Sequence, residues 1–236
     1  MCIEAATGNE VWKIDRESDG IIECLHSYAS PFIWSNGKEA YLLTHGNDYT
    51  IAHDLKDGKE LWRLGGLNPK GMDYNRTLRF VASPVCTPDM IVVPSAKHRS
   101  VVAVNPLATG KFDHSSKHAL WNLPKATPDV PCPLVVDGLV YLVGEAGSLT
   151  CVDAKSGKIL YEKSPGKGYH RASPVHADGK IFVTARDGTV VVVKAGPTYE
   201  VLGTNRTNET QTASPALAGE RLYLRCFKNL YAIGMK

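Results

Sequence analysis

Residues 52–62 read AHDLKDGKELW: an apolar run ends in an acid and is followed by a glycine–lysine pair and a tryptophan. Residues 151–161 repeat this pattern as CVDAKSGKILY, and residues 2–12 repeat its outline as CIEAATGNEVW. An acid at this position can cap the turn before a last strand, and a large aromatic can pack against an adjoining sheet. We therefore predict that the aromatics of this pattern pack between sheets and do not form a ligand platform. They are Trp12, Trp62, Trp121 and Tyr161.

A second repeat is the phrase Ala-Ser-Pro, which begins at residues 29, 82, 172 and 213. Pro131-Cys132-Pro133 stands in the same place between the second and third copies. The last prolines of these five phrases are 53, 49, 41 and 41 residues apart. A period of about 40–50 residues without a helical pattern is typical of four-stranded propeller blades.

Each repeat has the same internal order of strands and turns. A short apolar run follows the proline and leads to a turn such as Asn36-Gly37, Asp137-Gly138 or Asp178-Gly179. These pairs tolerate the positive φ of tight hairpin turns. The second strand is nearly all apolar, as at residues 139–143, so both of its faces must be covered by neighbouring sheets. The fourth repeat departs from the pattern at residues 194–202, which leaves its outer strand the least defined.

The pattern at residues 52–62 resembles the tryptophan-docking motif of the pyrroloquinoline-quinone-like (PQQ-like) β-propeller repeat family, and the resemblance covers almost the whole chain. It implies an all-β propeller of four-stranded antiparallel blades. The chain also resembles bacterial extracytoplasmic repeat proteins, including the propeller lipoprotein of outer-membrane β-barrel assembly. The resemblance therefore implies a periplasmic or extracytoplasmic location in the cell envelope. The chain itself opens Met1-Cys2-Ile3-Glu4, with neither the basic nor the apolar segment of a signal peptide.

We predict a single propeller domain over residues 1–236 with about five blades. The predicted segments are a partial blade at 1–20, blades at 21–70, 71–125, 126–165 and 166–205, and a partial blade at 206–236. A closed five-blade ring and a fragment of a seven- or eight-bladed propeller are both open. We favour the fragment, because the leading third strand would be redundant in a closed ring. An open blade would expose an apolar sheet face, so we expect self-association, which light scattering can test.

Composition excludes several classes of protein. The chain is 43% hydrophobic, and no apolar run approaches the roughly 18 residues of a membrane helix. The net charge of +3 is small and the basic residues are spread, so we expect no nucleic-acid partner. None of the six cysteines has CxxC spacing, which argues against a zinc site or a redox dithiol. We favour buried free thiols over a disulfide framework.

The candidate site lies on the loops that lead into the first strand and on those that join the second and third strands. We expect both sets to open on one face, beside the channel, with seven Lys or Arg side chains against four carboxylates. A basic mouth favours an anionic ligand or an acidic protein partner, while the plainer alternative is a solvated rim. Residues 168–171 are the best single candidate. The predicted ligand-binding residues are Tyr169, His170, Arg171, Arg79, His98, Arg186 and Arg225.

Catalytic motifs are missing from the sequence. It has no GxSxG, HExxH, GxxxxGK[ST] or CxxCH, and no adjacent cysteines. Lone carboxylates such as Asp48, Asp129 and Asp187 are interpreted as turn residues. We predict no catalytic residue, no metal ligand and no cofactor, and a scaffold propeller that binds proteins or ligands. The resemblance leaves two alternatives: a dehydrogenase that binds pyrroloquinoline quinone with calcium, and an extracytoplasmic sensor region of a larger protein.

Overall fold

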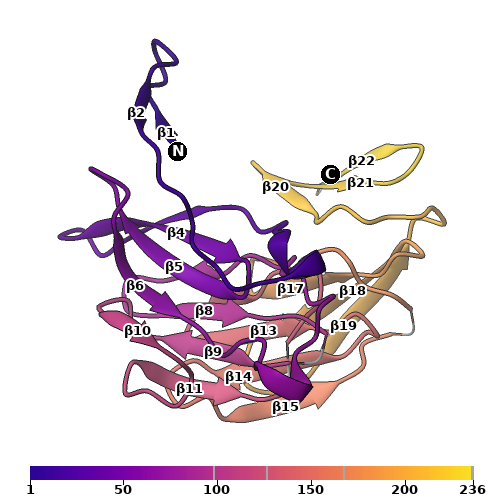
Figure 1. Ribbon diagram of the computed structural model, residues 1–236. Helices are drawn as coiled ribbons and strands as arrows, with labels where there is room; N and C mark the ends of the chain where they lie inside the picture. The colour runs from indigo at the N-terminus through magenta and orange to yellow at the C-terminus, as the bar shows by residue number, and fades with distance from the viewer. Residues whose placement is uncertain (98, 126, 167, 235–236) are drawn as a thin grey trace. The chain divides into compact units, whose positions relative to one another are not determined.

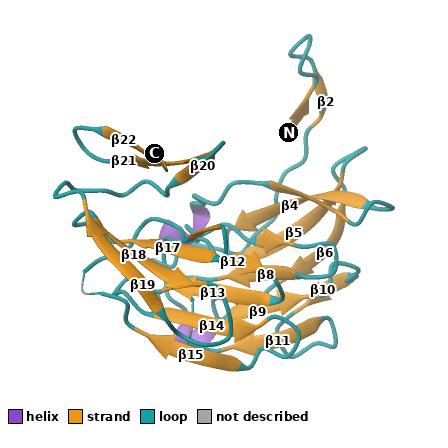
Figure 2. Cartoon of the chain, turned by 180° about the vertical axis from the view of Figure 1, so that it is seen from behind, coloured by secondary structure: helices purple, strands orange, loops and turns teal. Residues whose placement is uncertain are grey.

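The computed structural model describes residues 1–97, 99–125, 127–166 and 168–234. In these ranges the chain consists of β-strands, connecting loops and two short 3-10 helices (Figure 2). It forms two compact units, Met1–Asn122 and Leu123–Lys236, which are described separately. The expectation of a single domain stays a prediction.

The first unit contains the leading hairpin and two larger sheets (Figure 1). Its elements are β1 (Cys2–Ile3), β2 (Glu10–Trp12), η1 (Ile22–Leu25), β3 (Phe32–Ser35), β4 (Ala40–Gly46), β5 (Tyr49–Asp54), β6 (Glu60–Leu64), η2 (Gly71–Asp73), β7 (Val85–Cys86), β8 (Ile91–Pro94), β9 (Val101–Val104), β10 (Gly110–Phe112) and β11 (Ala119–Leu123). The sheet orders are β1-β2, β10-β6-β5-β4-β3 and β11-β9-β8-β7.

The second unit contains two four-stranded sheets and a three-stranded sheet. Its strands are β12 (Leu134–Val136), β13 (Leu139–Val143), β14 (Leu149–Asp153), β15 (Ile159–Lys163), β16 (Val175–Ala177), β17 (Lys180–Thr184), β18 (Thr189–Lys194), β19 (Val201–Arg206), β20 (Ala216–Ala218), β21 (Arg221–Arg225) and β22 (Leu230–Gly234). Within each sheet the strands follow chain order. Neighbouring strands of these three sheets pair antiparallel.

The prediction of four-stranded antiparallel blades is confirmed, and the turn chemistry explains the hairpins. Asp137 and Gly138 have φ values of 50° and 73°, and Asp178 and Gly179 have 48° and 67°. Two consecutive left-handed residues are what a two-residue type I′ hairpin requires. The expected burial of the second strand is seen at β8, where all four residues are buried, whereas only Leu224 of β21 is buried. The outer strand of the fourth repeat, the least defined in the sequence, is β19.

The two longest repeats contain extra segments outside the four strands. In the repeat after Pro31, residues 65–79 form a loop that includes η2. In the repeat after Pro84, β10 leaves its own sheet and pairs parallel to β6, with Gly110 opposite Trp62. These additions account for repeat spacings of 53 and 49 residues where the later repeats need 41.

The serine of the Ala-Ser-Pro phrase joins consecutive repeats. The Ser83 hydroxyl accepts a hydrogen bond from the Ser30 backbone N–H at 2.9 Å. In the second unit, Ser173 Oγ accepts from the Cys132 N–H at 2.9 Å, and Ser214 Oγ accepts from the Ser173 N–H at 2.8 Å. One serine therefore satisfies a backbone donor of the repeat before it, which gives the repeated phrase a structural role.

Replacing Ser214 by alanine removes the acceptor for the Ser173 N–H. The free energy of unfolding of the second unit should fall by about 0.5–1.5 kcal/mol, the typical contribution of one such hydrogen bond. Chemical denaturation monitored by circular dichroism measures the change. Thr212→Ala, an exposed hydroxyl in the same loop, is the control and should change stability by less than about 0.5 kcal/mol.

Aromatic side chains connect neighbouring sheets within each unit. In the first unit, Trp34 Nε1–H donates to the Thr87 carbonyl at 2.9 Å, and Trp12 Nε1–H donates to the Leu55 carbonyl at 3.0 Å. In the second unit, the Tyr141 hydroxyl accepts from the Gly196 N–H at 2.8 Å. For Trp12, the predicted packing between sheets is thus observed directly.

Candidate functional site

Backbone hydrogen bonds join the two sets of candidate loops in the second unit. The Arg186 N–H donates to the Tyr169 carbonyl at 2.8 Å, and the Gln211 N–H donates to the Arg186 carbonyl at 2.9 Å. Gln211 also forms an antiparallel bridge with Cys226. The loop between β17 and β18 is therefore held between the loops that lead into β16 and β20.

A cavity of about 660 Å³, open to solvent, lies at this junction. Arg186 comes from the turn after β17, and Arg225 is the last residue of β21. Both arginines were predicted as ligand-binding residues, and both line this cavity. The cavity is lined by Arg186, Thr210, Thr212, Ala213, Arg225, Cys226 and Phe227.

The turn that carries Phe227 is held by Glu209. One carboxylate oxygen of Glu209 accepts from the Tyr231 hydroxyl at 2.6 Å and from the Asn229 side-chain amide. The other accepts from the backbone N–H groups of Lys228 and Asn229 at 3.0 and 3.2 Å. The hydrogen bonds from Tyr231 and Asn229 lower the pKa of Glu209 to about 2, because they favour the ionised form. The Glu209 carboxylate thus holds this turn through four hydrogen bonds.

The remaining predicted residues of the second unit lie in different environments. His170 is 1% exposed, and its backbone N–H donates to the Glu145 carbonyl at 2.9 Å. Burial lowers the pKa of its imidazole. The His170 ring therefore packs inside the loop and does not reach a ligand in this conformation. Tyr169 is 66% exposed, and Arg171 is half-exposed with its guanidinium 3.8 Å from the Glu145 carboxylate.

Two predicted residues remain, Arg79 and His98. Arg79 belongs to the first unit, where it forms an ion pair with Glu23 and lies 5.9 Å from the ring centre of Tyr28. His98 lies outside the described residues.

The sequence interpretation missed five lining residues: Thr210, Thr212, Ala213, Cys226 and Phe227. Cys226 and Phe227 directly follow the predicted Arg225, and this adjacency is the signal that was available. Phe227 is 79% exposed, and its N–H donates to the Thr210 carbonyl at 2.9 Å, so the two loops meet at this pair.

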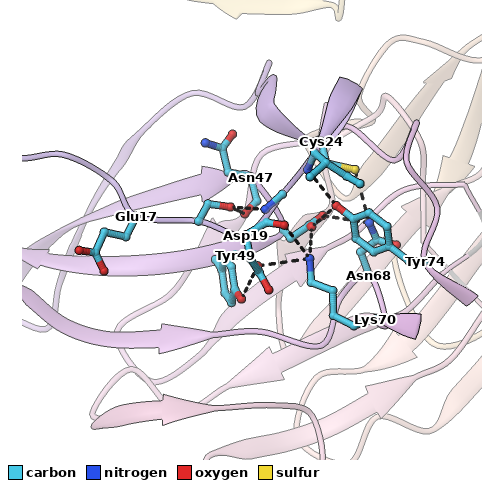
Figure 3. Close-up of polar contacts among 12 residues, drawn as sticks. Glu17, Asp19, Cys24, Asn47, Tyr49, Asn68, Lys70 and Tyr74 are labelled. Carbon is cyan, nitrogen blue, oxygen red and sulfur yellow. Dashed lines mark hydrogen bonds and ion pairs between the residues drawn. The ribbon is translucent and has the colours of Figure 1, made fainter. Parts of the chain in front are cut away.

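The first unit contains a separate polar network around Asp48 (Figure 3). The Asp48 carboxylate is 2% exposed and accepts hydrogen bonds from Asn68 at 3.0 Å, Lys70 at 2.9 Å and Tyr74 at 2.7 Å. Lys70 also lies 3.2 Å from an Asp19 oxygen. Burial opposes the charge of Lys70, but its bonds to Asp48 and Asp19 outweigh burial and raise its pKa.

The interpretation of Asp48 as a turn residue is confirmed. Asn47 and Asp48 have φ values of 49° and 66° in the turn between β4 and β5. The network adds a second role, because it ties this turn to the loop at residues 65–79. Asp187 is also a turn residue: its side chain accepts from the Thr189 N–H at 3.0 Å.

His45 in the first unit makes stability depend on pH. It is 4% exposed, stacks on Phe80 with ring centres 4.4 Å apart, and its Nδ1 lies 2.7 Å from the Thr50 hydroxyl. Burial, with a smaller contribution from the charge of Arg16, lowers the pKa of His45 from 6.5 to about 3. Below pH 6.5 His45 is therefore protonated in the unfolded chain but stays neutral in the folded chain. The free energy of unfolding falls as pH decreases from 6.5 towards 3.

We expect the His45→Gln variant to lose less stability than the wild type over this pH range. His45 contributes up to about 1.4 kcal/mol per pH unit to the slope of the free energy of unfolding against pH. Urea denaturation at a series of pH values measures both slopes. Equal slopes in the two proteins would show that His45 does not stay neutral in the folded state.

All six cysteines are free thiols, and Cys24, Cys151 and Cys226 are buried. None of the described helices is long and apolar enough to cross a membrane. Within the described ranges, no group of three His, Cys, Asp or Glu side chains is placed to hold a metal ion.

Comparison with known sequences identifies relatives. A family model described as "Outer membrane protein assembly factor BamB" matches residues 1–160 and 110–234. The outer membrane protein assembly factor BamB of Marinobacter adhaerens (strain DSM 23420 / HP15) is 27% identical over 96 residues. That match covers 41% of this chain and 24% of the relative, so it spans about a quarter of the relative's length.

Solved structures show the same fold. BamB from Moraxella catarrhalis superposes with a TM-score of 0.54 at 14% identity, over 98% of this chain and 76% of that one. Quinohemoprotein alcohol dehydrogenase ADHIIG from Pseudomonas putida HK5 superposes with a TM-score of 0.70 at 14% identity, over 95% of this chain and 42% of that one. At such identities the likeness concerns the fold alone, and it confirms the propeller class. With a family model that matches nearly its whole length, the chain belongs to the PQQ-like repeat family described as outer membrane protein assembly factor BamB.

Proposed function

We propose that this chain is a non-catalytic scaffold propeller that binds proteins in the bacterial cell envelope and takes part in outer membrane protein assembly. The observation that carries this proposal is the family match, which extends over residues 1–160 and 110–234. The same relationship supports a periplasmic or outer-membrane-associated location.

The cavity at Arg186 and Arg225 supports a binding role. Phe227 exposes a large aromatic beside two arginines, and aromatic and arginine side chains are enriched where proteins bind one another. The loops that carry them are tied by backbone hydrogen bonds, so little order has to be gained on binding.

The cavity does not fit the calcium that would accompany a bound quinone. Calcium takes six to eight oxygen ligands, mainly carboxylates and carbonyls. The lining residues include two guanidinium groups and no carboxylate, so they would repel the ion. We therefore propose that this cavity binds neither calcium nor a quinone that depends on it.

Two experiments test this proposal. Deleting the gene in its own bacterium should reduce the fraction of newly made outer membrane proteins that reach the folded form in the membrane, and a plasmid copy should restore it. Unchanged assembly after deletion would refute the proposal. In the second experiment, pyrroloquinoline quinone with calcium should leave the melting temperature of the purified protein unchanged. Stoichiometric binding with a higher melting temperature would favour the dehydrogenase alternative, because a ligand of the native state stabilises it.

A further inference from the structure

The charges around the cavity of the second unit are unbalanced. Its lining contains Arg186 and Arg225 and no acidic side chain. Neither arginine forms an ion pair with a carboxylate in the part of the chain that the structure describes. Two cations that line one cavity repel each other, and an anion bound there would reduce that repulsion.

The nearest acids in the sequence are already engaged elsewhere. Asp187 follows Arg186 directly, but its carboxylate pairs with Arg206 and accepts from the Thr189 N–H. Glu209 precedes Thr210, but its two oxygens hold the turn at residues 228–229 and the Tyr231 hydroxyl. The chain's own neighbouring carboxylates therefore do not neutralise the cavity.

One guanidinium is oriented by its own turn. A terminal nitrogen of Arg225 donates to the Cys226 carbonyl and lies 3.4 Å from the carbonyls of Phe227 and Asn229. This fixes the group at the end of β21, and its other nitrogens donate to no residue in the described part of the chain. A planar fork with fixed orientation suits a carboxylate, which can accept two parallel hydrogen bonds.

The size and the lining of the cavity favour a peptide ligand over a small ion. A volume of about 660 Å³ falls in the range that accommodates a ligand of several groups, and a single inorganic anion would fill only a small part of it. Thr210 and Thr212 add hydroxyl groups to the wall, and Phe227 adds an exposed aromatic ring. The site thus combines donors for carboxylates with a surface for an apolar side chain.

Building on the proposed function, we infer that this cavity receives an acidic segment of the protein partner, with one or more Asp or Glu side chains next to an apolar or aromatic residue. The carboxylates pair with Arg186 and Arg225, and the apolar residue packs on Phe227. The interaction is electrostatic in part, so it weakens as salt increases.

A peptide library displayed on phage and selected against the immobilised chain tests this inference. Sequences rich in Asp or Glu beside an aromatic residue should be enriched. The Arg186→Gln/Arg225→Gln double variant should bind the selected peptides at least tenfold more weakly. Lys155→Gln/Lys158→Gln removes the same charge from exposed positions of the β14–β15 turn, outside the cavity lining, and should bind them normally. Arg186→Lys/Arg225→Lys keeps the charge without the fork and should bind with intermediate affinity.

Selection of neutral or basic peptides, or equal binding by the two Gln variants, would overturn the inference. Complete displacement of the bound peptide by inorganic phosphate would also overturn it, because that result would identify a simple anion site. The outcome is separable from the proposed function. If deletion impairs outer membrane protein assembly and the Arg186→Gln/Arg225→Gln gene restores it fully, the proposed function holds and this inference fails. If acidic peptides bind but deletion has no effect on assembly, the site stands and the proposed function fails.

Discussion

Replacing Trp62 by alanine should lower the free energy of unfolding of the first unit by about 3–5 kcal/mol, the usual cost of removing a buried tryptophan. Trp62 is 1% exposed and lies edge-on to Tyr41, with ring centres 5.9 Å apart. Its other side meets Phe112 of β10, at 5.7 Å between ring centres. The substitution therefore creates a cavity where the sheet of β3–β6, strand β10 and the core meet.

Leu61→Ala is the matched control. Leu61 precedes Trp62 in the same strand but is 42% exposed, so its removal should cost much less. Guanidinium denaturation, followed by circular dichroism, measures both variants. A loss below about 1 kcal/mol for Trp62→Ala would contradict the packing role assigned to the aromatic of the repeat pattern.

The second large effect is expected at Asp48. In the Asp48→Ala variant, the amide of Asn68, itself 2% exposed, loses one of its acceptors, and the hydroxyl of Tyr74 loses the carboxylate to which it donates. An unsatisfied buried donor costs about 1–3 kcal/mol, and alanine at a left-handed position adds roughly 1 kcal/mol. We expect a total loss of about 2–4 kcal/mol, reduced by the partial exposure of Lys70, whose ammonium can be hydrated.

Asp48→Asn separates the two contributions. Asparagine tolerates the left-handed turn conformation and keeps one carbonyl acceptor, but it removes the charge that holds Lys70. Its loss of stability should be clearly smaller than that of Asp48→Ala in the same denaturation experiment. If the two variants were equally destabilised, the network would not depend on the turn conformation as described.

The repeat predicted the fold because its residues specify turn conformations and strand burial that recur in every blade. The Asp-Gly pair at residues 137–138 requires a tight hairpin turn, and a second strand apolar on both faces requires neighbours on both sides. The Ala-Ser-Pro phrase gave the period. Its hydrogen bond from one repeat to the next, as from the Ser173 N–H to Ser214, joins atoms 41 positions apart and became visible only in three dimensions.

The candidate site was only partly predictable. The loops of Arg186 and Arg225 could be chosen from their place in the repeat, since equivalent loops of neighbouring blades meet on one face. Their shared cavity depends on how the loop at residues 207–212 packs against the β17–β18 turn, where the Thr207 N–H donates to the Gly188 carbonyl at 3.0 Å. That contact follows from the packing of two repeats, which neither loop sequence specifies.

His170 and Asp48 show most clearly that sequence alone does not predict the burial of loop side chains. Both stand in loops where an exposed, ligand-facing side chain was plausible, yet the structure buries them at 1% and 2% exposure. The sequence by itself determined the all-β class, the repeat, the hairpin turns and the aromatic packing positions, because these follow from periodicity and backbone preference. Only the tertiary structure decided which loop side chains are buried and which two arginines line one cavity, because burial depends on contacts between residues distant in the chain.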